Sequence, residues 1–380
     1  MLLPEMNAYL TDLGGADKKW MILGLWTIAA AIARPFSGKI ADNISRKSVM
    51  YFGIIVSVLI SFSYPYFVTV TGFLLLRFLH GFSTGFHPTG ATALIADVIP
   101  QGKRGEAMGV FGVMISVGFS AGMAIGSPIK LAFGVEGLFY GSAIMGILSM
   151  ILLVFIQEKT TKKSQIEPVD EPKVAAIEPK EPLWRRVIPR WNEIIAPEVI
   201  HPTTIMFLTA MISGIYMVVV PDISEGLGMK NKGMFYLINV LFTVVTRFTA
   251  GKLYDRFGAR RNLNVGLGLM ILATFLTGTA QSVEQFMFSG VIYGIAAGIC
   301  SPALFAWTAD LANPIFKGRG MSTMFIALEL GLASGAYLTQ VLYNNDPGHI
   351  FALFIGAMVI CGVGILYLLG TKERKRQVSI

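Results

Sequence analysis

Two groups of ionisable side chains stand inside long apolar runs of this sequence. Glu329, in FIALELGLASG, is the one acidic residue of 23 that lies deep within such a run. Burial disfavours the charged form of a carboxyl, so a glutamate there can load and release protons near neutral pH. Its alternative role is that of a fixed partner for an arginine in another apolar run. The first chemistry to expect is therefore reversible protonation.

The second group is a polar stripe on one predicted helix. Arg77, His80, Thr84 and His87 are spaced i, i+3, i+7 and i+10, so they share a helical face, and Pro88 then favours a kink. An arginine in apolar surroundings needs water or a partner, and histidine changes charge near neutral pH. We expect the stripe to line a central cavity and to serve proton transfer or an anionic substrate. A structural hydrogen-bond network between helices is the alternative.

The composition places the chain in a membrane. Of its 380 residues, 54% are hydrophobic and 14% are charged, whereas a soluble domain carries about 25% charged residues. The apolar runs reach the helical length that crosses about 30 Å of hydrocarbon, and they must be helices because lipid offers no hydrogen bonds to the backbone. We predict an all-α membrane protein with eleven complete spans, at 20–38, 49–69, 72–96, 105–128, 137–156, 202–221, 233–250, 262–281, 285–309, 320–342 and 349–369.

The basic residues indicate the orientation. Of the 31 Lys and Arg, 23 fall on one side, in the loops 38–48, 97–104, 157–200, 251–262 and 310–319 and in the tail 370–380. An excess of Lys and Arg marks the cytoplasmic side of a membrane protein. The net charge of +8 is therefore typical of a multi-pass protein in the lipid bilayer of the bacterial cytoplasmic membrane, and it does not indicate a nucleic-acid partner.

The sequence repeats itself at an offset of 213 residues. GKIADNISRK at 38–47 returns as GKLYDRFGARR at 251–261, and the same offset pairs Arg34 with Arg247 and Asp97 with Asp310. Agreement at charged loop positions, without gaps, indicates a duplication into two parallel halves. We predict an N-terminal bundle at 1–156, a cytoplasmic linker at 157–200, a C-terminal bundle at 201–370 and a basic tail at 371–380.

Two parallel halves require an even number of spans, and six in each half would give twelve. LLPEMNAYLTDLGG at the start is similar to VVPDISEGLG at 219–228, but a full apolar span precedes Pro221 and only three residues precede Pro4. We expect the chain to begin inside its first helix, either at an internal methionine or in a truncated sequence. A true eleven-span protein with its amino terminus outside is the alternative.

At 38–47 the sequence resembles the signature loop between helices 2 and 3 of the major facilitator superfamily, Gly-x-Leu-Ala-Asp-x-x-Gly-Arg-Lys. Gly38, Asp42, Arg46 and Lys47 match this pattern, and Ser45 replaces its second glycine. The second copy keeps Gly251, Asp255, Gly258 and Arg260, but has Ala259 where the first has Arg46. The resemblance covers nearly the whole chain and implies two six-helix bundles related by pseudo-two-fold symmetry.

Two further segments carry the same resemblance. RFLHGFSTG at 77–85 is similar to the fourth-helix motif of the superfamily, with His80 in place of a glutamine. The glycines of the fifth helix, at 109, 118, 122 and 126, have the spacing of its exporter motif, although Met123 stands where that motif has proline. The sequence thus resembles the bacterial branch of drug or metabolite:proton antiporters.

The resemblance also implies a gate at the cytoplasmic face. The loop aspartate caps the start of helix 11, here near Gly318, where a carboxylate is stabilised by the helix dipole, and the contact exists only when the gate is closed. The second copy acts in the same way near Gly105, and the basic residues also hold both loops inside. The predicted gating residues are Gly38, Asp42, Arg46, Lys47, Asp97, Gly251, Asp255, Arg256, Arg260 and Asp310.

Other segments carry weaker signals. Trp26, Tyr216 and Trp307 are candidates for contact with an apolar substrate, with ordinary packing as the alternative. The stretch LWRRVIPRWNEII at 183–195 alternates apolar and basic groups, so we expect it to lie on the anionic inner leaflet. The preceding residues 157–182 are rich in Lys, Glu, Pro and Ser and are typical of a flexible linker.

These features favour a secondary transporter. The sequence has no phosphate-binding Gly-x-x-x-x-Gly-Lys-Ser/Thr loop, no metal-ligand spacing among its four histidines and no nucleophile–base pattern, so neither an enzyme nor an ATP-driven pump is indicated. The leading interpretation is a monomer that exports a drug-like or amphipathic molecule, driven by protons and without a cofactor. Uptake or facilitated diffusion of a sugar or organic anion is the alternative, and a non-transporting sensor or scaffold is a third.

Overall fold

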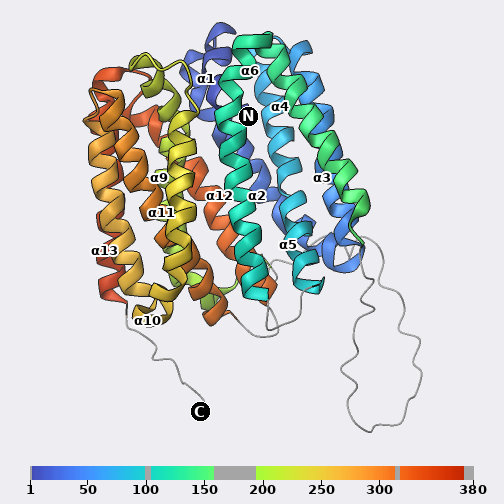
Figure 1. Ribbon diagram of the computed structural model, residues 1–380. Coiled ribbons are helices and arrows are strands. Elements are labelled where there is room, and N and C mark those ends of the chain that lie inside the picture. Colours follow the sequence, from blue (N-terminus) through green and yellow to red (C-terminus); the bar gives the residue numbers. More distant parts are fainter. Residues whose placement is uncertain (1, 99–103, 158–193, 313–316, 372–380) are drawn as a thin grey trace, which may run out of the picture.

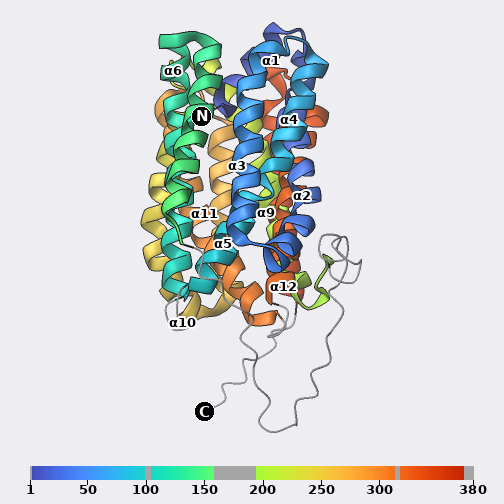
Figure 2. The same cartoon turned by 90° about the vertical axis from the view of Figure 1, so that its right-hand side faces the viewer.

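The computed structural model describes residues 2–98, 104–157, 194–312 and 317–371, apart from some side chains near the helix ends. All regular secondary structure in these ranges is helical (Figure 1). The long helices run roughly side by side along one direction, as Figure 2 shows after a turn of 90°. The predicted all-α membrane class is confirmed.

The N-terminal half contains α1 (Leu3–Asp12), α2 (Lys19–Asn43), α3 (Arg46–Ser63), α4 (Val70–Thr84), α5 (His87–Val98) and α6 (Arg104–Phe155). Single turns at Ala16–Lys18 and Tyr64–Tyr66 join some of them. The long helix α6 turns back at Gly134, where φ is 71° and ψ is −174°. Only glycine adopts this backbone conformation readily, so α6 consists of two antiparallel arms.

The C-terminal half contains α9 (Ile200–Gly226), α10 (Met234–Gly278), α11 (Val283–Leu311), α12 (Lys317–Leu342) and α13 (Ile350–Gly370). Single turns precede α9 at Pro197–Val199 and α13 at Pro347–His349. Helix α10 turns back at Gly258, where φ is 75° and ψ is 172°. This glycine belongs to the second copy of the repeated loop, so the motif itself makes the turn.

Helix covers every range in which a span is predicted, but the count of eleven is not fully confirmed. Within the described residues, seven helical segments are long and apolar enough to cross a membrane, and one of them, Val110–Phe155, covers two predicted spans. The predicted span 72–96 is divided between α4 and α5, which are separated at Gly85 and Phe86. Pro88 follows that break directly, as expected for a residue that disrupts helical hydrogen bonding.

The duplication is visible in how the helices pack. A side chain at Gly81 of α4 would collide with the backbone of Trp26 in α2, and one at Gly294 of α11 would collide with the backbone of Asn239 in α10. Both members of the first pair lie 213 residues before those of the second. Small residues let membrane helices approach closely, so the repeat preserves the same tight helix contact in each half.

The two halves lie next to each other and meet along two pairs of helices. Helix α2 packs on α12, and the first arm of α6 packs on α10. Figure 1 shows the N-terminal half in blue to green and the C-terminal half in yellow to red, with these helices between them. The signature loop after α2 and the turn at Gly258 lie at the same end of the molecule, which the basic loops predict to be cytoplasmic.

Candidate transport site

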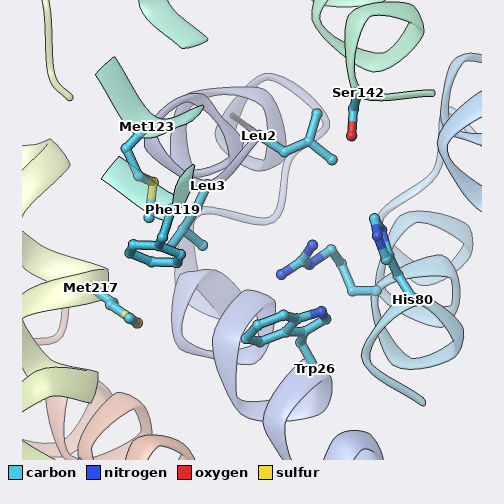
Figure 3. A pocket seen from close by; sticks show the side chains of 9 residues that line it. Leu2, Leu3, Trp26, His80, Phe119, Met123, Ser142 and Met217 are labelled. Atoms are coloured by element: carbon cyan, nitrogen blue, oxygen red, sulfur yellow. The ribbon is translucent and has the colours of Figure 1, made fainter. Parts of the chain in front are cut away.

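A cavity of about 170 Å³ lies where the two halves meet. The first residues of the described chain, α2, α4, both arms of α6, and α9 enclose it (Figure 3). Ligand pockets usually have volumes of about 300–1,000 Å³, so the cavity is too small for a drug-sized molecule while the halves are this close. The lining residues are Leu2, Leu3, Trp26, Arg77, His80, Phe119, Met123, Ser142 and Met217.

Arg77 provides the positive charge of this cavity. Its side chain is 5% exposed, its Nε donates to the carbonyl of Ile22 over 3.1 Å, and its guanidinium lies 5.7 Å from the ring centre of Trp26. Among the described residues Arg77 forms no ion pair, so its charge is available to an anionic group.

His80 lies one turn further along α4 and lines the same cavity. Its Nε2 is 2.8 Å from the hydroxyl of Ser57, and its Nδ1 is 3.3 Å from that of Tyr64. Thr84 and His87 instead line a second cavity inside the N-terminal half. The predicted polar stripe is therefore divided between two cavities: Arg77 and His80 line the central one, whereas Thr84, at the end of α4, and His87, at the start of α5, line the second.

Glu329 of α12 forms an ion pair with Arg34 of α2. The Nη2 of Arg34 lies 2.7 Å from Oε1 of Glu329, and the two side chains are 10% and 7% exposed. The guanidinium of Arg34 also stacks over Phe325 at 4.8 Å. This pair joins the two halves deep between α2 and α12. Removing one partner of a buried ion pair is strongly destabilising, by about 3–5 kcal/mol, so the pair holds the halves together at this point.

A second bridge lies at the equivalent position of the other helix pair. Arg247 of α10 donates from Nη1 to the carbonyl of Gly112 at 3.0 Å and to the hydroxyl of Ser116 at 3.1 Å. The offset of 213 that relates Arg34 to Arg247 also relates Ser116 to Glu329. The halves are thus joined by two symmetry-related arginines, one bound to a carboxylate and the other to neutral oxygens.

This second bridge escaped prediction, although a signal for it was present. The repeat paired Arg34 with Arg247, but it did not show which residue faces either arginine. Subtracting the offset from Glu329 gives Ser116, a residue that can accept a hydrogen bond but carries no charge. A search for the repeat partner of every intramembrane charge would have found the pair of bridges.

Hydrogen bonds also join the halves at the end of the molecule away from the signature loop. Asn7 of α1 donates to the carbonyl of Val218 at 2.8 Å and to Asp222 at 3.0 Å, both in α9. Lys19 forms an ion pair with the same aspartate at 3.1 Å. In this conformation the halves are therefore in contact on both sides of the central cavity.

The predicted gating residues are only partly described. The side chains of Asp42, Asp97 and Asp255, together with Gly105, Gly251 and Gly318, lie outside the part of the chain whose surroundings the structure gives. Arg46 donates to the carbonyl of Ala41. Lys47 donates to the carbonyls of Val154 and Ile156 at 3.1 and 2.8 Å, which satisfies the carboxyl end of α6.

The gating residues of the second copy contact their own half. Tyr254 donates to Asp310 at 2.8 Å, which ties α10 to α11. Arg256 is exposed and lies over the ring of Phe257 at 5.2 Å. Arg260 is partly buried.

Gly38 on α2 has open space around the position of a side chain. The predicted interfacial segment 183–195 lies almost wholly outside the described residues.

Of the three candidate aromatic residues, Trp26 alone lines the central cavity. Tyr216 is buried in the C-terminal half, where its ring stacks on Tyr293 at 4.2 Å and its hydroxyl lies 2.9 Å from Thr277. Trp307 stacks on His201 at 6.4 Å, away from the cavity. Tyr216 and Trp307 therefore contribute packing contacts in this conformation.

The fold and the paired bridges define a transporter built from two homologous bundles. The sequence matches the Major Facilitator Superfamily over residues 1–236 and again over 203–379. The chain belongs to this superfamily, whose members transport small molecules and are not enzymes.

Relatives and solved structures agree with this assignment. The chain is 24% identical to multidrug resistance protein 2 of Bacillus subtilis, over 100% of this chain and 92% of that protein. It is 25% identical to an uncharacterized transporter of the same superfamily from Methanocaldococcus jannaschii, over 93% and 90% of the two chains. The crystal structure of a D-xylose–proton symporter superposes with a TM-score of 0.73 at 14% identity, over 97% of this chain and 92% of that one.

Proposed function

We propose that this chain exports a drug-like or amphipathic molecule across the bacterial cytoplasmic membrane in exchange for protons. It acts as a monomer, and the proton-motive force is its energy source. The observation that carries the proposal is the buried ion pair between Arg34 and Glu329, which bridges the two halves at 2.7 Å. A proton on Glu329 removes the charge that binds Arg34, so protonation and separation of the halves become linked events.

The position of the pair supports this direction of exchange. Helix α12 enters from the cytoplasmic end at Lys317, so Glu329 lies about 18 Å along it at 1.5 Å per residue, on the cytoplasmic side of the cavity. Protonation from outside breaks the bridge and lets the cytoplasmic side open. Release of the proton into the cytoplasm restores the carboxylate, which closes that side again around a bound substrate. One cycle then moves a proton inward and the substrate outward.

The lining of the central cavity favours an amphipathic substrate. Trp26, Phe119, Met123 and Met217 offer aromatic and sulfur-containing surfaces, and methionine adapts its shape to different partners. The name of the Bacillus subtilis relative, multidrug resistance protein 2, supports this substrate class. When the halves separate on one side, the cavity of about 170 Å³ would enlarge to admit such a molecule.

Arg77 supports a second candidate function, the uptake of a polar organic anion or sugar. A buried guanidinium without a described carboxylate partner would bind an anionic substrate through paired hydrogen bonds. The structural similarity to a D-xylose–proton symporter extends to the fold and is compatible with this alternative. The two functions differ in the direction in which substrate and protons move.

Proteoliposomes with an internal pH dye would test the proposal. Under an imposed proton gradient we expect ethidium, a lipophilic cation, to drive proton flux, and Glu329→Gln to abolish it. Glu284→Gln is the matched control, because Glu284 lies in the first turn of α11 far from both bridges. Proton flux with xylose or benzoate alone would favour the uptake function. The absence of flux with every probe would favour a sensor or scaffold.

A further inference from the structure

The second cavity lies wholly within the N-terminal half. It has a volume of about 230 Å³ and is enclosed by α3, α4, α5 and the second arm of α6. Its polar lining consists of Ser57, Ser83, Thr84, His87 and Ser149. Because a water molecule occupies about 30 Å³ and needs polar partners, the cavity has room and hydrogen-bonding groups for several waters.

A hydrogen bond joins this cavity to the central one. His80 lines the central cavity and Ser57 lines the second, and the Nε2 of His80 lies 2.8 Å from the Ser57 hydroxyl. The other ring nitrogen, Nδ1, is 3.3 Å from the hydroxyl of Tyr64. The hydrogen bond between His80 and Ser57 therefore links the two cavities directly.

The groups around the two histidines include no described carboxylate. Arg77 and Tyr64 neighbour His80. His87 lines the second cavity and makes no hydrogen bond to a described side chain. From His87, helix α5 leads to the cytoplasmic end of the half (Figure 1). Polar groups therefore extend from the central cavity toward the cytoplasm inside one half.

The C-terminal half serves as an internal control for this arrangement. At an offset of 213, Ser57 corresponds to Met270, His80 to Tyr293, and the trio Ser83, Thr84 and His87 to Ala296, Ala297 and Cys300. Met270, Ala296 and Cys300 are at most 2% exposed and belong to one large apolar core. The same fold is stable with an apolar interior at these positions. The polar groups of the N-terminal half are therefore not required for packing.

We propose that these residues form a hydrated proton path from the central cavity through His80 and Ser57 to the second cavity and His87. The path rests on the proposed proton coupling and adds a second route for protons from the central cavity toward the cytoplasm, beside their release from Glu329. His80 accepts a proton at Nδ1 and gives up the one on Nε2 to Ser57, whose hydroxyl proton passes to water in the second cavity. Transfer of a proton from Nδ1 to Nε2 through water restores the starting tautomer, and one proton has moved with no other reactant.

The test replaces Ser57 by methionine, the residue that the C-terminal half has at the equivalent position, Met270. Ser57→Met fills the junction between the cavities, and we expect it to slow proton flux by at least about tenfold under a pH gradient with ethidium, benzoate or xylose as the probe. Exchange of the same probe at equal pH on both sides should be unchanged, because it requires no net proton movement. Ser63→Met is the control, since Ser63 is only partly buried near the end of α3 and bonds within its own helix, to the carbonyl of Leu59.

A second variant, His80→Tyr, keeps the test decisive if Ser57→Met folds poorly. It should also slow proton flux; substrate exchange is not its readout, because His80 lines the central cavity. If both variants carry protons at the rate of the unmodified protein while Glu329→Gln abolishes the flux, the path is wrong and the proposed function stands. If the unmodified protein moves no protons with any of the three probes, the proposed function and the path are both overturned.

Discussion

The two bridges between the halves occupy equivalent positions but differ in chemistry. Arg34 contacts the carboxylate of Glu329, whereas Arg247 contacts the carbonyl of Gly112 and the hydroxyl of Ser116. Duplication kept the arginine in both copies and allowed its partner to diverge. A proton can neutralise only the first bridge. The comparison teaches that a symmetric scaffold can carry asymmetric chemistry, in which one helix pair holds a titratable carboxylate and the other only neutral oxygens.

The interiors of the two halves show the same divergence. The C-terminal half encloses one continuous apolar core that includes Tyr216, Phe235 and Phe286. The N-terminal half has several smaller apolar clusters, and a polar cavity lies among them. The backbones also differ here, since α4 and α5 are separated at Gly85 and Phe86, whereas α11 continues through the equivalent positions. The N-terminal half thus contains the polar groups that line both cavities.

Making the two bridges alike by removing the charge should have the largest effect. In Glu329→Ser the carboxylate becomes the hydroxyl found at Ser116, so no group remains on this bridge to take up a proton. We expect proton-driven flux to fall by at least about a hundredfold, while exchange down a substrate gradient persists. Flux in proteoliposomes measures both. Proton coupling that survives in Glu329→Ser would show that the asymmetry of the bridges has no part in it.

Making the bridges alike by adding a charge should have a smaller effect. Ser116→Glu would give Arg247 a carboxylate partner, so two ion pairs would have to break before the halves separate. A coupling of 1–3 kcal/mol per bridge corresponds to transport slower by about tenfold at pH 7, with recovery at pH 5 as the new carboxyl is protonated. Ser116→Gln is the neutral control of similar size. Equal rates for the two variants at both pH values would contradict the prediction.

The glycines of α6 and α12 allow a comparison of packing. A side chain at Gly331 would collide with the backbone of Phe207 in α9, whereas the equivalent Gly118 has open space around it. Forcing a methyl group into a packed site costs about 1–3 kcal/mol. We expect Gly331→Ala to lower the melting temperature of the detergent-solubilised protein and Gly118→Ala to leave it unchanged. A similar loss in both variants would show that α6 is packed as tightly as α12.

Swapping the serine of one signature loop with the glycine of the other should lower the stability of the protein by unequal amounts. Ser45 has extended backbone and its hydroxyl accepts a hydrogen bond from the amide of Ser48, whereas the equivalent Gly258 has a φ of 75° that other residues avoid. Gly258→Ser should cost about 1–3 kcal/mol through backbone strain, and Ser45→Gly only a few tenths through loss of the cap. Thermal melts would rank the two variants. If Ser45→Gly lowered the melting temperature more than Gly258→Ser, the two loops would not differ in backbone strain as proposed.

The sequence predicted much of the architecture and the identity of the charged residues. The helical ranges follow from apolar runs, and the repeat follows from identical residues at one offset. The division of the stripe from Arg77 to His87 could not be predicted, because which cavity each residue reaches depends on the helices packed around it. The gating contacts of Asp42 and Asp255 stay predictions, since those side chains lie outside the described residues.

The chain alone determined which charges enter the membrane, because burying an ionised group is so unfavourable that each one stands out in an apolar run. Glu329, Arg34 and Arg247 were visible in this way, and so was the duplication that relates the two arginines. Only the tertiary structure decided which groups meet: Arg34 with Glu329, Arg247 with Ser116, and His80 with Ser57. A contact between helices depends on how each one is rotated about its axis, and that rotation is set by the packing of all the helices together.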